Sequence, residues 1–187
     1  ICIEPSKAIK VAKENNKGAT NIKFENIRGE DLNINNELDY VFSLGMIHHT
    51  PNAELVVKKI FQSLKTNGKF ICWVYGYEGN RIYVLLFNSL RKLTTHFPDF
   101  ILRILSHALN LICFIYIFLC KFTNLPMKNY MLNVFNKCSY EKRNYIIFDQ
   151  LNPSFAKYYK KKEIEELIKN SGFSKSEIFH RRGYSWT

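Results

Sequence analysis

The segment Asp39–Tyr75 constrains the fold more than any other part of the chain. It contains, in order, an apolar run, a helical repeat over residues 52–66 and a second apolar run, Lys69–Tyr75. Two apolar runs of strand length joined by an amphipathic helix predict a β-α-β unit with parallel strands. Open parallel sheets bind their ligands at the carboxyl ends of the strands. The loop after the first run, which holds His48 and His49, is therefore the first place to look for a site.

Local signals bound the helix of this unit. Thr50 and Pro51 are typical N-cap and first-turn residues, and Asn67–Gly68 is a typical stop. The helix is expected to bury an apolar face made of Leu55, Val56, Ile60 and Leu64.

Strand and helix patterns also alternate before this unit. Ile1–Glu4 is a strand by its apolar content, and Asn21–Glu25 alternates as a second strand. Between them we expect a helix over Ser6–Asn16, capped by Ser6 and closed near Gly18. Its apolar stripe would consist of Ala8, Ile9, Val11 and Ala12. The alternation predicts an α/β protein with a mostly parallel sheet.

The end of the chain has a different pattern. A short amphipathic helix is expected over Glu163–Asn170, closed by Ser171–Gly172. Two strands follow, one from Phe173 and one from Tyr184, separated by a turn at Arg182–Gly183. Strands so close in the chain pair antiparallel.

Residues 80–150 show helical periodicity without strand alternation. Within them, 17 of the 21 residues of Phe100–Cys120 are apolar. A spanning helix needs roughly 20 predominantly apolar residues. The segment falls just short, and its polar residues lie in its first half, so a buried or interfacial helix is favoured over a membrane span.

The net charge of +11 is concentrated outside the β-α-β unit. Residues 1–80 carry +1, residues 81–150 carry +6 and residues 151–187 carry +4. Such a surface suits nucleic acid, anionic lipid or an acidic substrate, but AT-rich coding can also enrich Lys.

The five cysteines show no C-x-x-C spacing, which predicts neither a disulfide framework nor a zinc site and fits a reducing, cytoplasmic compartment.

Several segments, taken together and in order, resemble a known family. They are ICIEPS, FENIRGEDL, LDYVFSLGMIHHTPN, LKTNGKFICWVYG and GFSKSEIFHRRGYSWT. The chain is similar to the class I S-adenosylmethionine-dependent methyltransferases of the bacterial methyltransferase-domain type. The resemblance implies a Rossmann-like, mostly parallel sheet with an antiparallel C-terminal hairpin and a helical lid after the fifth strand. It divides the chain into a partial core (1–78), the lid (79–150) and a C-terminal helix with closing strands (151–187).

One hallmark of the family has no counterpart, namely the glycine-rich loop after its first strand. We expect the sequence to begin just after the place of that loop. The chain would then lack a central strand and half of its cofactor site, and we would not expect it to be active alone.

The resemblance implies S-adenosylmethionine as cofactor and assigns residues to it. Glu4, the acid at a strand end, would accept both ribose hydroxyls; the alternative is a solvated carboxylate. The adenine side would use the backbone near Gly29 or the carboxylate of Glu30, because Arg28 stands where the family often has an acid. The methionine portion would pass Ser43, Leu44 and Gly45. No metal is implied.

Residues for the methyl acceptor are less specific. His48 and His49 are candidate catalytic bases, or else structural residues at the helix start. Aromatic and imidazole side chains near the expected mouth of the site are candidate substrate contacts, or else packing residues: Tyr75, Tyr158, Tyr159, His180 and Tyr184.

The sequence therefore predicts a methyltransferase acting on a small-molecule or lipid-like acceptor. The alternative is a non-catalytic, membrane-associated module with the same fold. Nucleic acid is disfavoured as a substrate, because GMIHHT follows Ser43–Leu44 where an N/D-P-P-Y/F/W motif would be expected. The expected location is the cytoplasm, with contact with the inner face of an anionic membrane as an open option.

Overall fold

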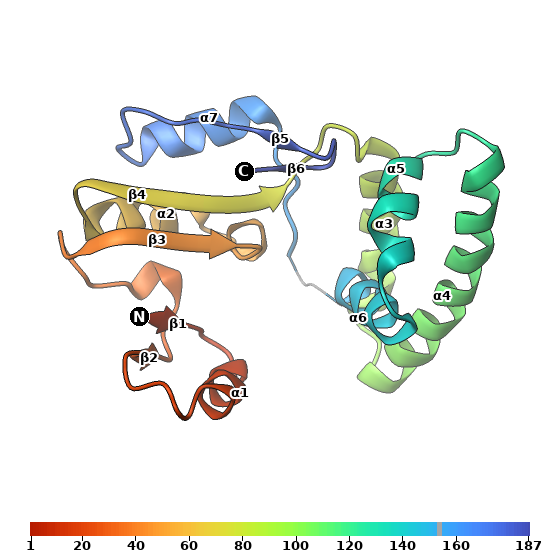
Figure 1. Ribbon diagram of the computed structural model, residues 1–187, viewed down its shortest axis with the longest axis horizontal. Helices are drawn as coiled ribbons and strands as arrows, with labels where there is room; N and C mark the ends of the chain where they lie inside the picture. The colour runs from red at the N-terminus through yellow and green to blue at the C-terminus, as the bar shows by residue number, and fades with distance from the viewer. Residues whose placement is uncertain (153–154) are drawn as a thin grey trace. The chain divides into compact units, whose positions relative to one another are not determined.

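The computed structural model describes residues 1–152 and 155–187. The chain forms two compact units (Figure 1). Unit 1 comprises Ile1–Trp73 and Lys162–Ile178, and unit 2 comprises Val74–Lys161 and Phe179–Thr187. The three-part division expected from the family resemblance stays a prediction, and each compact unit is described by itself.

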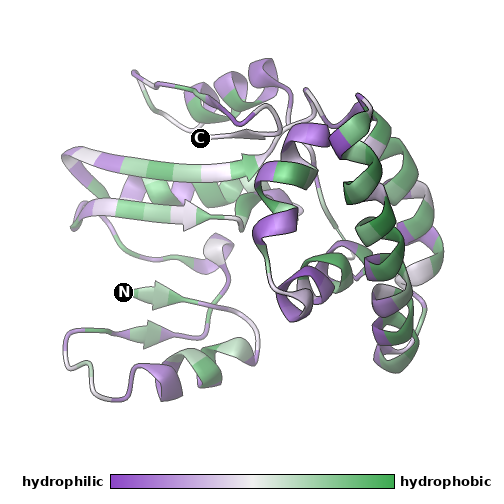
Figure 2. Ribbon diagram, turned by 45° about the vertical axis from the view of Figure 1, so that its right-hand side comes forward, coloured by the Kyte–Doolittle hydropathy of each residue, from purple (hydrophilic) through white to green (hydrophobic). Residues whose placement is uncertain are grey.

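Unit 1 contains two parallel strand pairs. β1 (Cys2–Ile3) pairs with β2 (Phe24–Glu25), and β3 (Leu38–Leu44) pairs with β4 (Leu64–Tyr75), which belongs to unit 1 as far as Trp73. All four strands point the same way in Figures 1 and 2. The α/β class and the parallel pairing are confirmed. The two pairs form separate sheets among the described residues, because β1 and β3 exchange no ladder.

α2 (Ala53–Ser63) joins β3 to β4. Asn52 caps it, since its Oδ1 accepts a hydrogen bond from the Leu55 N–H at 3.2 Å. The prediction that Thr50 is the cap was wrong, because the Thr50 hydroxyl instead donates to Met46 O. The buried face is made of Val56, Val57, Ile60 and Ser63, so Leu55 was wrongly assigned to the core.

The predicted helix stop at Asn67–Gly68 lies inside β4. The register between β3 and β4 shifts between the pairs Leu38–Leu64 and Tyr40–Lys69. Asn67 sits in this irregularity with a left-handed φ of 68°. The Asn67–Gly68 pair therefore lies in a β-bulge of β4 and does not end the helix. α2 ends earlier, at Ser63.

Two more helices complete unit 1, α1 (Ala8–Asn15) and α7 (Lys161–Asn170). Ile9 is the one buried residue of α1, so the predicted apolar stripe is wrong at Ala8 and Val11, which are exposed. The main core lies between α2 and the β3–β4 pair. It contains Leu32, Val56, Ile60 and Leu64, with Val41, Phe70 and Phe173 packed against them.

The other face of the β3–β4 pair is uncovered. Tyr40, Phe42 and Leu44 alternate along β3 and are 57–66% exposed. Ile71, which is opposite Phe42 on β4, is exposed as well. Because α2 covers one face, half of this sheet presents apolar side chains to solvent.

In unit 2 the last two residues of β4 start an antiparallel sheet. Val74 and Tyr75 pair with β6 (Ser185–Trp186), which pairs with β5 (His180–Arg181). Arg182 and Gly183, both with positive φ, form the turn. The antiparallel hairpin is confirmed. The prediction of a strand starting at Phe173 was wrong, because backbone pairing with the end of the chain begins only at Phe179, which exchanges two hydrogen bonds with Thr187.

The rest of unit 2 is helical, as predicted for residues 80–150. It contains α3 (Arg81–Thr94), α4 (Asp99–Phe122), α5 (Lys128–Asn133) and α6 (Tyr140–Leu151). α4 and α6 pack on a core of Leu102, Ile117, Cys120, Met131, Phe135, Ile147 and Leu151. Figure 2 shows α4 as hydrophobic along most of its length.

Candidate functional site

Glu4 lies directly after β1, at the carboxyl end of a parallel strand. Its Oε1 accepts a hydrogen bond from the Ser6 N–H at 2.9 Å, and its backbone oxygen accepts one from Asn26 Nδ2 at 2.7 Å. These bonds hold the carboxylate at the strand end. Among the described residues the second carboxylate oxygen accepts no hydrogen bond, so it can accept one from a ligand hydroxyl.

Gly29 and Glu30 lie in a single 3-10 turn, η1 (Gly29–Asp31). A Cβ on Gly29 would lie 2.9 Å from Val56 Cγ1, so contact with α2 already explains why glycine stands here. Glu30 is half-buried in the same turn. Their assignment to the adenine side stays a prediction.

The end of β3 separates the two side chains expected near the methionine portion. Ser43 is 5% exposed on the face toward α2, and Leu44 belongs to the uncovered face. Because Ser43 and Leu44 lie on opposite faces, a single ligand can contact only one of these two side chains, together with the backbone at the strand end. The buried Ser43 hydroxyl oxygen has no hydrogen-bond partner among the described residues.

Gly45 makes the turn that ends β3. Its φ of +90° is a conformation that only glycine adopts without strain, and its N–H donates to Trp73 O at 3.0 Å. The backbone is therefore fixed and free of a side chain at the carboxyl edge of the sheet.

The two histidines follow in η2 (Ile47–His49) and have different environments. His48 is 0% exposed, and its ring lies 4.4 Å from the His49 ring and edge-on to Trp73 at 5.8 Å. His49 is only partly buried. Since a general base must reach its proton, His49 is the better placed of the two, although neither role is tested.

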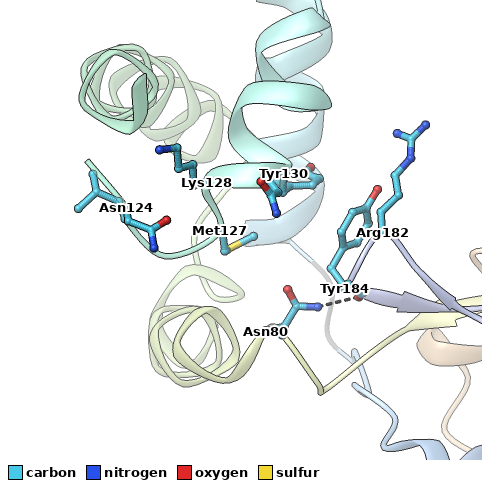
Figure 3. Close-up of a pocket in the computed structure, with 11 residues that line it drawn as sticks. Asn80, Asn124, Met127, Lys128, Tyr130, Arg182 and Tyr184 are labelled. Carbon is cyan, nitrogen blue, oxygen red and sulfur yellow. Dashed lines mark hydrogen bonds between the residues drawn. The ribbon is translucent and has the colours of Figure 1, made fainter. Parts of the chain in front are cut away.

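A cavity of about 260 Å³ lies within unit 2 (Figure 3). Asn80 holds one wall, because its Nδ2 donates to Tyr184 O at 2.7 Å and to Gly76 O at 2.8 Å. Tyr130 contacts Tyr184 edge-on at 5.1 Å on another side. The charged residues of the lining, Lys128 and Arg182, are both cations. The cavity suits a polar or anionic group.

The structure does not bring the predicted substrate residues together. Tyr184 lines the cavity, but Tyr159 is buried and its N–H donates to Tyr75 O at 2.9 Å. The exposed ring of His180 stacks on Trp186 at 4.3 Å. Tyr75 and Tyr158 belong to a different cluster.

That cluster is a polar network around Gln150. Its Oε1 accepts hydrogen bonds from Tyr83 Oη at 2.6 Å, from Arg91 Nη2 at 2.8 Å and from Tyr158 Oη at 3.3 Å, while its Nε2 donates to Tyr75 Oη at 2.9 Å. Arg91 is 7% exposed. Burial raises the pKa of Tyr75 to about 12 and also raises the pKa of Tyr83. No short-range pattern in the sequence indicates this network, because its members lie on segments that are far apart in the chain.

No group of three or more His, Cys, Asp or Glu that could hold a metal ion occurs in the described ranges, 1–152 and 155–187. The chemistry available at the strand ends is thus that of a carboxylate, a hydroxyl, imidazoles and exposed backbone.

Comparison with known families gives one match, and it covers the part of the chain that contains the ends of β1 and β3. The methyltransferase domain model matches residues 1–72. Over these residues the chain is similar to the methyltransferase-domain family. This confirms the recognition of the class I, S-adenosylmethionine-dependent type made from ICIEPS and the β3 segment. The methyltransferase match stops at Cys72, so the function of α3–α6 has to be argued from their own residues.

Two solved structures have some likeness to the chain. One is the YcgJ protein of Bacillus subtilis, 22% identical, with a TM-score of 0.42 over 48% of this chain and 41% of that chain. Another, from Nostoc punctiforme PCC 73102, carries the description of a candidate O-methyltransferase; it is 16% identical, with a TM-score of 0.49 over 98% and 42%. The chain spans about two fifths of the length of both. No curated protein matches its sequence.

Proposed function

We propose that this chain is part of an enzyme that transfers a methyl group from S-adenosylmethionine to a small-molecule or lipid-like acceptor. The family match of residues 1–72 carries the proposal. The positions of Glu4 and Gly45 support it, because each follows a strand of a parallel pair at the carboxyl end, where α/β sheets bind ligands.

The residues at the strand ends fit the cofactor. The oxygen of Glu4 that has no partner would accept from the ribose hydroxyls, and the backbone of Gly45 would let the methionine portion approach closely. The Ser43 hydroxyl would gain a partner that it lacks among residues 1–152 and 155–187. The turn of Gly29 and Glu30 would border the adenine.

His49, and less directly His48, would take a proton from an oxygen acceptor. The cofactor itself supplies an activated methyl group, so the protein needs chiefly to align the acceptor and exclude water.

The two separate strand pairs of unit 1 support the view that the cofactor site is incomplete in this chain. The outer edge of β3 pairs with no strand in the described ranges, and the side chains of Tyr40, Phe42 and Leu44 lie uncovered beside it. One further parallel strand between β1 and β3 would join the pairs into a continuous sheet. We propose that this is the family's first strand, which brings the glycine-rich loop, and that methyl transfer is weak or absent without it.

The acceptor would be bound by unit 2, the helical part that corresponds to the expected lid. The cavity beside Tyr184 has room for a small polar group, and Lys128 and Arg182 favour a negatively charged one. A lipid-like acceptor with an anionic head would satisfy both this cavity and the apolar helices around it.

Calorimetric titration with S-adenosylmethionine tests the proposal, on this chain and on its full gene product. Replacing Glu4 with Gln should weaken binding by roughly 10- to 100-fold, as expected for hydrogen bonds to a charged group. Glu14→Gln, an exposed carboxylate on α1, is the matched control and should bind normally. If the full gene product does not bind the cofactor, the enzyme proposal fails and the non-catalytic membrane module becomes the better explanation.

A further inference from the structure

The polarity of α4 is partly inverted with respect to a helix of a water-soluble protein, because polar side chains lie beside Leu102, Ile117 and Cys120 on its buried side. Ser106 and Asn110 face the interior, where Asn110 Nδ2 donates to Tyr140 O at 3.1 Å and to Asn144 Oδ1 at 3.0 Å. The outer side is apolar. We define the α4 face as six outward residues that are 56–74% exposed: Ile104, Leu111, Ile112, Ile115, Phe118 and Phe122. Large apolar side chains on the outside and polar ones on the inside are typical of a helix that contacts an apolar phase.

α3 shows the same inversion. Arg91 and Thr94 are buried and bond to residues of α6, through Arg91 Nε to Gln150 O at 2.8 Å and Thr94 Oγ1 to Leu151 O at 2.8 Å. Four of its exposed positions are large and apolar, and they alternate with exposed polar ones: Ile82, Leu85, Leu86 and Leu93 beside Arg81, Asn88, Ser89 and Lys92. The inversion is thus shared by α3 and α4.

Cations border the α4 face. Arg103 and Lys121 are both exposed, and their separation of 18 residues is about five helical turns, which places them on the same flank. Asp99, at the helix start, is the one acidic residue of α4. An apolar stripe flanked by basic side chains is complementary to lipid tails beneath anionic headgroups.

Arg103 and Lys121 also argue against a second copy of the chain as the partner that covers the α4 face. A two-fold contact through the α4 face, centred on Ile112, would place Arg103 of one copy opposite Lys121 of the other. Like charges at such an interface repel each other. Anionic phosphate would instead neutralise both cations, so a lipid surface is the favoured partner.

The packing of α4 also indicates how it meets the membrane. Among the described residues it is the one helix that is long and apolar enough to cross a bilayer by length and composition. However, it packs along α6, which carries Glu141, Lys142 and Asp149 on its exposed side. A spanning α4 would draw these charges into the hydrocarbon, whereas a helix lying in the plane leaves them in water.

We propose that the α4 face docks on an anionic lipid bilayer, with α4 parallel to the membrane plane and Arg103 and Lys121 at the level of the headgroups. This surface shares no residue with the strand-end site. Its test requires no S-adenosylmethionine, so failure of the docking proposal and failure of the methyltransferase proposal are distinguishable.

Co-flotation of the chain with vesicles tests the proposal. We expect the protein to float with phosphatidylcholine vesicles that contain phosphatidylserine at low salt, and to float far less with pure phosphatidylcholine or at high salt. An alkaline carbonate wash should release it, as it does proteins that lie on a membrane.

Two double variants with matched controls locate the contact. Arg103→Gln with Lys121→Gln should weaken binding to the anionic vesicles by roughly 30-fold, as expected for two cations near such a surface. Ile115→Gln with Phe118→Gln should weaken it by at least about tenfold. The controls make the same changes elsewhere on the surface: Lys10→Gln with Lys13→Gln, and Val11→Gln with Phe179→Gln. Both controls should bind as the parent chain does, and circular dichroism should show all four variants folded.

Four results would overturn the docking proposal. They are absence of flotation with anionic vesicles at low salt, equal losses in the α4 variants and their controls, resistance to the carbonate wash, and a lipid-free dimer that Ile115→Gln with Phe118→Gln dissociates. The third result would make α4 a membrane span, and the fourth would make a second copy its partner.

Discussion

Replacing Gln150 with Met removes the centre of the polar network in unit 2 at nearly constant side-chain volume. The buried Arg91 loses the 2.8 Å acceptor of its Nη2, and the partly buried Tyr83 loses the 2.6 Å acceptor of its Oη. A lost bond to a charged donor costs about 1.5–3 kcal/mol, and a buried hydroxyl left without a partner costs about 1–3 kcal/mol. We therefore expect the free energy of unfolding to fall by about 3–5 kcal/mol.

Urea denaturation followed by circular dichroism at the helical band measures this change for Gln150→Met. Gln150→Glu is the informative partner variant, because it keeps the acceptor oxygens and adds a charge complementary to Arg91. It should therefore lose less than about 1 kcal/mol. Gln62→Met, at an exposed position on α2, controls for the chemical change itself and should stay within about 0.5 kcal/mol. A loss below about 1 kcal/mol for Gln150→Met would show that water replaces the amide and would refute the reasoning.

Three further predictions concern stability. Gly45→Ala should cost about 1–3 kcal/mol in urea denaturation because of the φ of +90°, whereas Gly18→Ala, with open space around it and no positive φ, should cost nothing; equal effects would contradict the strain argument. Gly29→Ala should destabilise the chain by its 2.9 Å approach to Val56, and a smaller cost of Gly29→Ala in a Val56→Ala background should reveal the contact in a double-mutant cycle. The raised pKa of Tyr75, about 12 when folded against 10 for the free side chain, gives stability that is fully present below pH 10 and lost as the pH rises toward 12; Tyr75→Phe should flatten this alkaline loss in pH-dependent denaturation.

Local patterns predicted those parts of the fold that local interactions determine. The β3–α2–β4 unit has two apolar runs and a helical repeat that agree with each other, and the hairpin at Arg182–Gly183 has a turn that permits only close antiparallel strands. Errors arose where two local signals competed. Thr50 and Asn52 are both good N-caps, and only the path of the chain after Met46 decides for Asn52.

The candidate site was predicted as a set of positions but not as side-chain directions. Strand alternation places Ser43 and Leu44 on opposite faces, yet which face is covered depends on α2. In the same way, the sequence showed an apolar segment at α4 without revealing that the amide of Asn110 points inward. Its partners, Tyr140 and Asn144, lie on α6, more than 25 residues away in the chain, and no short-range pattern links them.

The position of Cys72 has a practical consequence. Its thiol lies on the β3–β4 pair opposite Ser43, and burial raises its pKa to about 11, so almost none of it is thiolate at neutral pH. Alkylating reagents attack thiolates, so this partly buried thiol should react slowly in the folded unit and faster when the strands separate. Labelling at Cys72, read by mass spectrometry over time, would therefore report how often this β-α-β unit opens, without any engineered probe. Comparing that rate with and without S-adenosylmethionine would show whether the ligand holds the strands together.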